Sequence, residues 1–101
     1  MTDVTARDVE RARVRLDETG LVDRTPIEAS RSLGDRGGGT VRLKMEHLQR
    51  TGSFKPRGAL NRLAVLQADP AVERVVAASA GNHAQGVALA ASHFDVEARI
   101  V

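Results

Sequence analysis

The sequence contains no cysteine, no tryptophan and no tyrosine, and only two of its 101 residues are phenylalanine. Without cysteine the chain forms neither disulfides nor thiolate metal sites, an absence that fits a reducing compartment. Because aromatic side chains are so scarce, we expect a core of alanine, valine, leucine and isoleucine. The charged N-terminus and the lack of any long apolar run argue against a signal peptide and a membrane span.

The sequence also lacks a strong excess of charge of either sign, since its formal net charge is +2. Basic and acidic residues alternate, as they do over residues 7–11, and no aromatic residues are interleaved with the basic ones. This pattern is typical of solvated helix faces and gives little support to a nucleic-acid partner.

The first half of the chain predicts one helix and two strands. A helix over residues 5–18 begins with a threonine and an aspartate at capping-box spacing and ends at Gly20. Strands are expected over residues 27–33 and 40–45, the second with the alternation of a half-buried strand. The glycines within residues 34–39 could cradle a phosphate. They precede a strand and open no helix, however, so a flexible hairpin connection is favoured.

The second half predicts a helix followed by a β-α-β unit. Ser53 has the character of an N-cap, with a proline tolerated in the first turn of the helix. An apolar strand is expected over residues 72–78, then a helix over residues 82–93 and a second strand over residues 96–101. Such units are nearly always right-handed with parallel strands, and the apolar first strand predicts cover on both of its faces. The expected fold class is therefore α/β.

Lys55 is the first candidate for chemistry. It lies in the first turn of the predicted helix, where the positive end of the helix dipole disfavours an ammonium group. A lysine that forms an imine has to present its neutral amine, and helix-end placement together with burial acts in that direction. The alternative, an ordinary surface lysine, stays open on this segment alone. The neighbouring Phe54 is either a pocket wall or a core residue, and its spacing favours the core.

A second candidate site is the turn over residues 79–83, which follows the apolar strand and opens the next helix. Backbone N–H groups at such a turn can bind an anion, Gly81 permits close approach of a ligand, and Ser79 and Asn82 add side-chain donors. A plain helix cap is an equally good explanation of this turn. His83 is either an acid–base group or a structural residue. The spacing of the histidines does not support a metal site.

Three segments resemble those of a known enzyme family. Residues 44–59 read KMEHLQRTGSFKPRGA and are similar to the family pattern K-x-E-x-L-Q-x-T-G-S-F-K-x-R-G-A. Residues 79–86 read SAGNHAQG, which is similar to the family's asparagine loop, and residues 25–27 resemble its early T-P-[LI] segment. The chain resembles the N-terminal portion of a fold-type II pyridoxal-phosphate enzyme of the threonine dehydratase (threonine ammonia-lyase) and serine racemase group. The implied fold is the open parallel-sheet α/β fold of tryptophan synthase β-like enzymes.

The resemblance assigns roles to residues of both longer segments. Lys55 would form the Schiff base with pyridoxal 5'-phosphate and would act as the base for the α-proton of the substrate. Phe54 would pack against the cofactor ring, and Asn82 would hydrogen-bond the phenolic oxygen of that ring. The substrate carboxylate would be bound by the loop of Ser79, Ala80, Gly81, Asn82 and His83. The cofactor would supply the electron sink, while the protein supplies orientation and proton transfer.

The implied reaction is β-elimination of water from L-threonine, and also from L-serine, to give a 2-oxo acid and ammonia. The resemblance further implies amino-acid metabolism, specifically isoleucine biosynthesis, in the cytoplasm, and homo-oligomers among full-length relatives. Ala80 counts against a racemase, because serine racemases typically carry serine at that place. A serine racemase, another type II lyase and a non-catalytic α/β module stay open as alternatives.

The resemblance also divides the chain. Residues 1–72 would begin the larger, cofactor-binding domain, and residues 73–101 would begin the smaller α/β domain, both of them incomplete. The family's glycine-rich loop for the cofactor phosphate and the residue facing the pyridine nitrogen lie further along the family's chain than these 101 residues. We therefore expect a truncated chain that carries the catalytic lysine and is inactive by itself.

Overall fold

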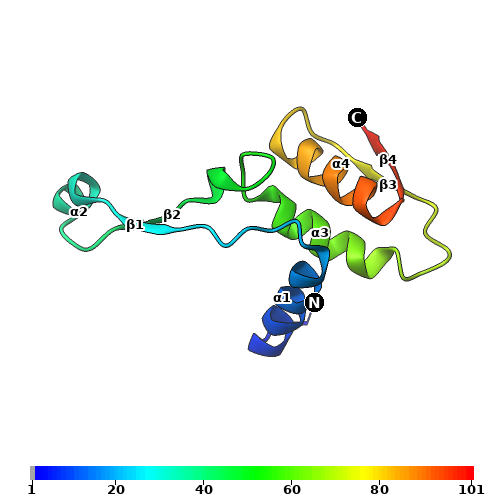
Figure 1. Ribbon diagram of the computed structural model, residues 1–101, viewed down its shortest axis with the longest axis horizontal. Coiled ribbons are helices and arrows are strands. Elements are labelled where there is room, and N and C mark those ends of the chain that lie inside the picture. The colour runs from blue at the N-terminus through cyan, green and yellow to red at the C-terminus, as the bar shows by residue number, and fades with distance from the viewer. Residues whose placement is uncertain (1) are drawn as a thin grey trace.

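The computed structural model describes residues 2–101 as an extended arm, a packed pair of helices and a small parallel sheet (Figure 1). In chain order the elements are α1 (Ala6–Thr19), β1 (Ile27–Ala29), α2 (Arg31–Gly37), β2 (Arg42–Lys44), the 3-10 helix η1 (Glu46–Leu48), α3 (Lys55–Leu66), β3 (Arg74–Ala77), α4 (Asn82–Phe94) and β4 (Glu97–Ile100). The radius of gyration is 16.1 Å, whereas a compact domain of this length has about 13 Å. Across residues 2–101, none of the helices combines the length and apolar character needed to cross a membrane.

Helix α1 begins and ends as its local sequence predicts. Asp8 N donates to Thr5 Oγ1 at 3.3 Å and Thr5 N donates to Asp8 Oδ2 at 2.9 Å, which completes the predicted capping box. Gly20 closes the helix at φ 66°, in the left-handed region that glycine adopts without strain. Arg15 donates to Asn61 Oδ1 at 3.0 Å and so ties α1 to α3.

The arm is an antiparallel ribbon of β1 and β2 with α2 at its tip (Figure 1). In the register of this ribbon, Ala29 of β1 pairs with Arg42 of β2. The predicted strand over residues 27–33 is wrong beyond Ala29, because Ser30 Oγ accepts a hydrogen bond from Leu33 N and caps α2. The flexible connection expected next is therefore mostly a short helix. The predicted half-buried strand is also wrong, since all residues of β1 and β2 are exposed.

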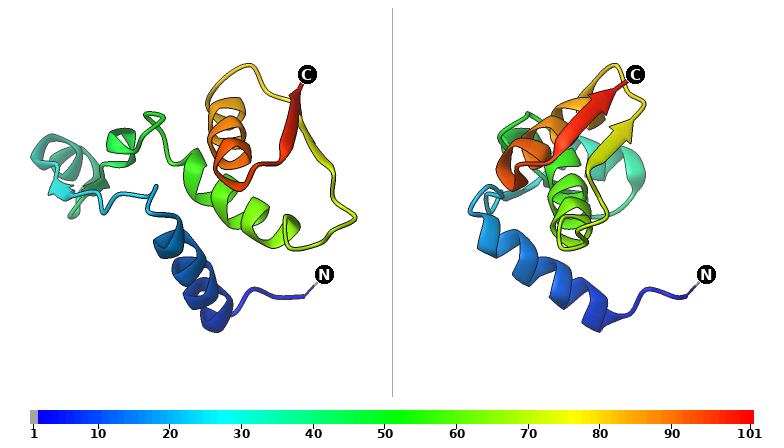
Figure 2. Two further views of the ribbon diagram at one scale, coloured as in Figure 1. Left: turned by 45° about the vertical axis from the view of Figure 1, so that its right-hand side comes forward. Right: turned by 90° about the vertical axis from the view of Figure 1, so that its right-hand side faces the viewer.

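Strands β3 and β4 are parallel and α4 is the crossover helix between them, as the sequence predicts. Val75, Ala77 and Ala98 contact the core formed by α3 and α4, and the two helices run side by side in both views of Figure 2. Val76, between two of these residues, is 64% exposed. Within residues 2–101 the sheet is thus covered on one face, and the cover expected on both faces of β3 is not found.

The core lies between α3 and α4. Its buried members are small aliphatic residues: Ala59, Leu60, Leu63, Val87, Ala90 and Ala91. This composition confirms the core expected from a sequence poor in aromatic residues. Side chains of this size let two helices approach closely, and at Gly86 the backbone of α4 lies against the first residue of α3.

Candidate active site

Lys55 is the first residue of α3, at the end of an irregular loop. The structure places the N-cap at Phe54, one residue after the predicted cap, and Ser53 Oγ accepts a hydrogen bond from Lys55 N at 3.3 Å. Pro56 is buried in the first turn, where its missing N–H has no intrahelical partner. The fixed backbone of the proline and the serine hydroxyl together define where the helix starts.

The Lys55 side chain is half-buried, and its Nζ lies 5.2 Å from the centroid of the Phe54 ring. Within residues 2–101 no carboxylate forms a salt bridge with this amine. Phe54 is 60% exposed, so the expectation that it belongs to the core is wrong. An amine without a carboxylate partner beside an exposed aromatic ring is available to react with a carbonyl and to bind a planar group.

Gly86 brings α4 against the backbone of Lys55. A Cβ atom added to this buried glycine would lie 3.1 Å from the Lys55 carbonyl carbon and 3.2 Å from its Cβ and its carbonyl oxygen. Residues four positions apart on a helix share a face, so Asn82 lies one turn before Gly86 on the face of α4 that meets α3. The structure therefore brings together the two segments that the sequence analysis singled out.

The turn before α4 starts directly at the end of β3. Ser79 N donates to Val101 O at 3.1 Å, while Ser79 Oγ accepts hydrogen bonds from Gly81 N at 3.1 Å and from Ala84 N at 3.2 Å. Inside residues 2–101, no hydrogen bond is found for the backbone N–H groups of three residues of this turn, namely Ala80, Asn82 and His83. These N–H groups at a helix N-terminus form a place for an anion.

The side chains of Asn82 and His83 are both exposed. His83 lines a groove of 230 Å³ between α3, β3 and α4, next to Leu63 and Val75. In the part of the chain that the structure describes, His83 forms no ion pair with a carboxylate.

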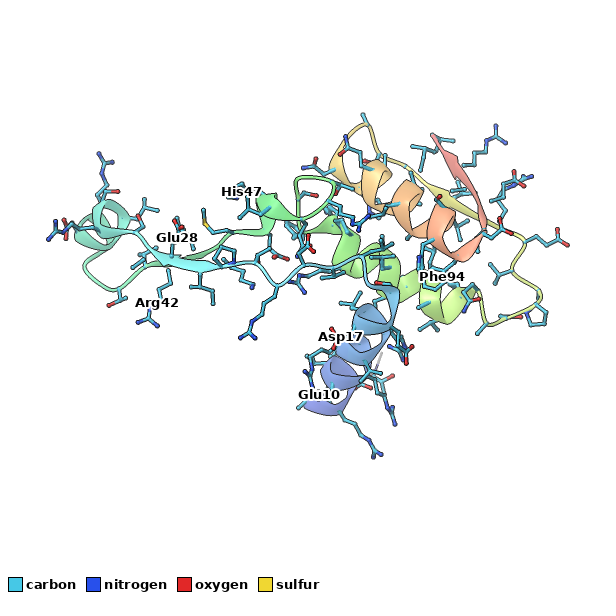
Figure 3. All side chains as sticks on the ribbon, viewed as in Figure 1. Glu10, Asp17, Glu28, Arg42, His47 and Phe94 are labelled. Atoms are coloured by element: carbon cyan, nitrogen blue, oxygen red, sulfur yellow. The ribbon has the colours of Figure 1, made fainter. Side chains whose placement is uncertain are left out.

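Metal binding finds no support in residues 2–101, where no group of three or more histidine, cysteine, aspartate or glutamate side chains could hold an ion. Figure 3 shows that His47 lies on η1, while the acids Glu10 and Asp17 lie on α1 and Glu28 on the arm.

A group that the sequence analysis did not assign to any role surrounds Glu46, and we call Thr25, Glu46, Gln49 and Arg57 the Glu46 cluster. Thr25 Oγ1 donates to Glu46 Oε2 at 2.6 Å, Gln49 Nε2 donates to the same oxygen at 3.2 Å, and Arg57 Nε donates to Glu46 Oε1. The hydrogen bond from Arg57 lowers the pKa of Glu46 to about 2, outweighing burial, and the bonds from Thr25 and Gln49 act in the same direction. Two polar side chains of this cluster are almost fully buried, Thr25 with 5% and Gln49 with 3% of their surface exposed.

A signal for this cluster was present in the sequence. Acidic, amide and basic side chains recur within residues 44–57, the segment that also contains Lys55 at the start of α3. Their pairing was not predictable, because it depends on where the loop turns.

The residues present fit a cofactor that has a carbonyl group, with an anionic group of the substrate bound beside it. Besides the amine of Lys55 and the open N–H groups of the turn before α4, the hydroxyl oxygen of Thr51 is buried without a hydrogen-bond partner in residues 2–101. Thr51 precedes Lys55 in the same loop, and buried hydroxyls normally have a partner. The loop that precedes Lys55 therefore has an unused hydrogen-bonding group within residues 2–101.

Comparison with known proteins gives a consistent result. Residues 18–101 match the family described as pyridoxal-phosphate dependent enzyme. The chain is similar to an L-threonine ammonia-lyase from Thermotoga maritima, with 50% identity over 98 residues, which are 97% of this chain and 24% of that protein. It is 49% identical over 94 residues to an L-threo-3-hydroxyaspartate ammonia-lyase from a Pseudomonas species, covering 93% of this chain and 29% of that protein. Its fold is similar to maize serine racemase, with a TM-score of 0.80 and 33% identity over 98% of this chain and 30% of that chain.

The chain spans 24% and 29% of the length of these two curated relatives. The structural likeness confirms the predicted fold class, an α/β fold of the fold-type II, tryptophan synthase β-like kind. The relatives confirm the predicted group of ammonia-lyases and its cofactor, pyridoxal 5'-phosphate.

Proposed function

This chain belongs to the family of pyridoxal-phosphate dependent enzymes, and from that membership we propose that it is the lysine-bearing part of an L-threonine ammonia-lyase. The observation that carries the proposal is the contact between Gly86 and Lys55, because it puts the turn before α4 beside the first turn of α3. The 50% identity to an L-threonine ammonia-lyase supports the substrate class.

In this proposal Lys55 holds the cofactor through its amine and later takes the α-proton of the substrate. Phe54, exposed beside the amine, packs against the cofactor ring, and the Asn82 side chain hydrogen-bonds the phenolic oxygen of that ring. When bound, the cofactor withdraws electrons from the α-carbon and so makes its proton acidic.

The turn before α4 binds the substrate carboxylate in this proposal. The N–H groups of Ala80, Asn82 and His83 are the donors, and the Ser79 hydroxyl orients them through its bonds to the N–H groups of the same turn. The space beside the Gly81 α-carbon is open, since a Cβ built there would meet nothing within 4 Å. The carboxylate can therefore approach the backbone from this side. An anion at a helix N-terminus is further stabilised by the helix dipole.

The proposed elimination of water needs no oxidant or reductant. The α-proton goes to the Lys55 amine, the bond from the β-carbon to its hydroxyl breaks, and the hydroxyl leaves as water after protonation. Hydrolysis of the dehydrated product then releases ammonia and a 2-oxo acid, which is 2-oxobutanoate from L-threonine and pyruvate from L-serine.

Two further candidates have specific support. L-threo-3-hydroxyaspartate has the same β-hydroxyl group, and the 49% identity to an ammonia-lyase that acts on it favours this substrate as the second candidate. The likeness to maize serine racemase supports racemisation as a further candidate reaction. Ala80 counts against this reaction, because the resemblance implies a serine at that place in serine racemases. In the remaining alternative, a non-catalytic module, Lys55 would be present but would take part in no reaction.

We further propose that the longer protein forms homo-oligomers, acts in the cytoplasm on a small amino acid within isoleucine biosynthesis, and binds neither nucleic acid nor a membrane. The proposed division is a larger domain that begins with residues 1–72 and a smaller one that begins with residues 73–101. The 101 residues by themselves are proposed to bind the cofactor without turnover.

Lys55 can be tested directly, because Lys44 and Lys55 are the only lysines in the sequence. The chain is titrated with pyridoxal phosphate, reduced with borohydride and digested, and the labelled residue is identified by mass spectrometry. We expect saturable labelling of Lys55 that is lost in Lys55→Ala and kept in the matched variant Lys44→Arg. Labelling that is equal on both lysines and the N-terminal amine would contradict a specific cofactor site.

The reaction itself is tested in a chimera in which this chain replaces the segment it matches in the Thermotoga maritima enzyme. We expect 2-oxobutanoate and ammonia from L-threonine, and no product when Lys55→Ala is introduced. Oxaloacetate from L-threo-3-hydroxyaspartate in preference to 2-oxobutanoate would replace the first candidate by the second. D-serine formed from L-serine without 2-oxo acid would replace both by the racemase.

A further inference from the structure

Within residues 2–101, the side chains of the Glu46 cluster form no hydrogen bond with the side chains that the proposed function assigns to cofactor or substrate. Their one backbone link to these residues is from Arg57 N to the Phe54 carbonyl oxygen, at 3.2 Å. The cluster nevertheless contains two of the buried polar residues of the described chain, Thr25 at 5% and Gln49 at 3% exposed, and the Glu46 side chain is only 15% exposed. Buried polar groups are costly unless each finds a partner, and here one carboxylate serves three donors. A cluster of this kind holds its residues in one arrangement.

The carboxylate of Glu46 joins both ends of the segment that carries the lysine. Gln49 lies just before this segment and Arg57 just after it, in the first turn of α3. Gln49 Nε2 and Arg57 Nη2 both donate to Glu46 Oε2, at 3.2 Å and 3.3 Å, and Arg57 Nε donates to Oε1. Phe54 and Lys55 therefore lie in a loop that is closed by a single side chain.

The cluster is itself held by the extended segment that precedes the arm. Gln49 exchanges two hydrogen bonds with the backbone of Asp23, whose N–H donates to Oε1 at 2.9 Å and whose carbonyl accepts from Nε2 at 2.8 Å. Thr25 donates to Glu46, and the Thr25 carbonyl accepts a bond from Lys44 Nζ at 2.7 Å. The loop is thus fixed relative to residues far from it in sequence.

We propose that Glu46 is a positioning residue for Lys55, acting through Gln49 and Arg57 to set the direction in which the lysine leaves the first turn of α3. This inference rests on the proposed function, in which Lys55 is the lysine that holds the cofactor. Arg57 is two residues after Lys55 on the same turn, so its hydrogen bonds to Glu46 restrain the start of the helix. Without the carboxylate, the donors of Thr25, Gln49 and Arg57 lose their shared acceptor, and the loop has to rearrange to satisfy them.

The charge of Glu46 is required as well as its shape. Hydrogen bonds between a guanidinium group and a carboxylate are about twice as strong as neutral ones. Glu46→Gln keeps the length of the side chain but turns an NH₂ group toward donors, whereas Glu46→Asp keeps the charge and shortens the side chain by one carbon. The two variants therefore separate the contribution of charge from that of fit.

The test uses the whole chain with Glu46→Gln, Glu46→Asp and the matched control Glu28→Gln, an exposed acid of β1. Hydrogen exchange of residues 49–57 and of α4 is measured by mass spectrometry, and pyridoxal-phosphate labelling of Lys55 is measured after borohydride reduction. For Glu46→Gln we expect exchange over residues 49–57 to rise about tenfold, with α4 unchanged, and the concentration for half-maximal labelling of Lys55 to rise about tenfold. In Glu46→Asp we expect a smaller rise in the exchange rate and in the half-maximal labelling concentration than in Glu46→Gln. In Glu28→Gln we expect both quantities to stay unchanged.

Unchanged exchange over residues 49–57 in Glu46→Gln overturns the inference. So does an equal rise over residues 49–57 and α4, because this would show a general loss of stability instead of a local one. If the unmodified chain shows no specific labelling of Lys55, the proposal that these 101 residues bind the cofactor by themselves fails, and the proposed function is then decided by the chimera. In either case the exchange of residues 49–57 decides whether Glu46 positions the loop.

Discussion

The α-carbon of Gly86 lies so close to the backbone of Lys55 that a methyl group at that position would come within 3.1 Å of the Lys55 carbonyl carbon. This contact joins α4 to the first residue of α3. Real Cβ atoms rarely have a contact this short, and the neighbour here is backbone, which yields less readily than the end of a flexible side chain. The position of the lysine thus depends on a residue 31 positions later that has no side chain.

Gly86→Ala is expected to destabilise the chain by about 1–3 kcal/mol, because overpacking forces two helices apart. The free energy of unfolding is measured by urea titration with circular dichroism. The matched control is Gly58→Ala on α3, where an added Cβ meets nothing within 4 Å. That control is expected to stabilise the chain by about 0.5–1 kcal/mol through its higher helix propensity. Equal effects of the two variants would show that α4 does not press on Lys55.

Stability at acidic pH is expected to depend on Glu46. Its pKa is lowered from 4.5 to about 2 in the folded chain, so ionised Glu46 contributes stability that is complete above about pH 4.5. This contribution is lost as the pH falls toward 2, and it is on the order of 3 kcal/mol. Urea titrations between pH 7 and pH 2 are expected to show a shallower decline in Glu46→Gln than in the unmodified chain. A decline as steep in Glu46→Gln as in the exposed-acid control Glu28→Gln would contradict the assignment.

Ser79→Ala is expected to cost about 1 kcal/mol and to loosen the turn before α4, because the hydroxyl accepts bonds from Gly81 N and Ala84 N. Hydrogen exchange is expected to rise at residues 80–84. Ser92→Ala, at an exposed position of the same helix, controls for the removal of a serine hydroxyl. A turn that exchanges at the same rate in both variants would show that Ser79 does not order it.

Thr5→Ala is expected to shorten α1 from its N-terminus, at a cost of about 1 kcal/mol to the helix, because it removes one half of the capping box. Faster hydrogen exchange over the first turn of α1 measures this effect. Thr40→Ala provides the comparison, since Thr40 is exposed and lies outside the helices and strands. If both variants leave the exchange of α1 unchanged, the capping box does not hold the helix in solution.

Sequence alone was sufficient wherever a feature depends on neighbouring residues. The cap of α1, its glycine stop and the β-α-β unit were predicted correctly, because hydrogen bonds three or four residues apart and apolar periodicity are written locally. One of the local errors has a local cause. A strand was expected through Leu33, but the Ser30 hydroxyl caps a helix instead. The resemblance to an enzyme family also came from contiguous segments.

Only the tertiary structure decided how these segments meet. Residues 21 apart form the bond between Thr25 and Glu46, and the contact of Gly86 with Lys55 spans a loop, a helix and a strand. Neither periodicity nor composition states which face of α4 turns toward α3, because that choice depends on how small side chains fill the space between the helices. The sequence by itself therefore determined the residues of the candidate site, and the packing of α3 on α4 decided that the lysine and the turn before α4 lie together.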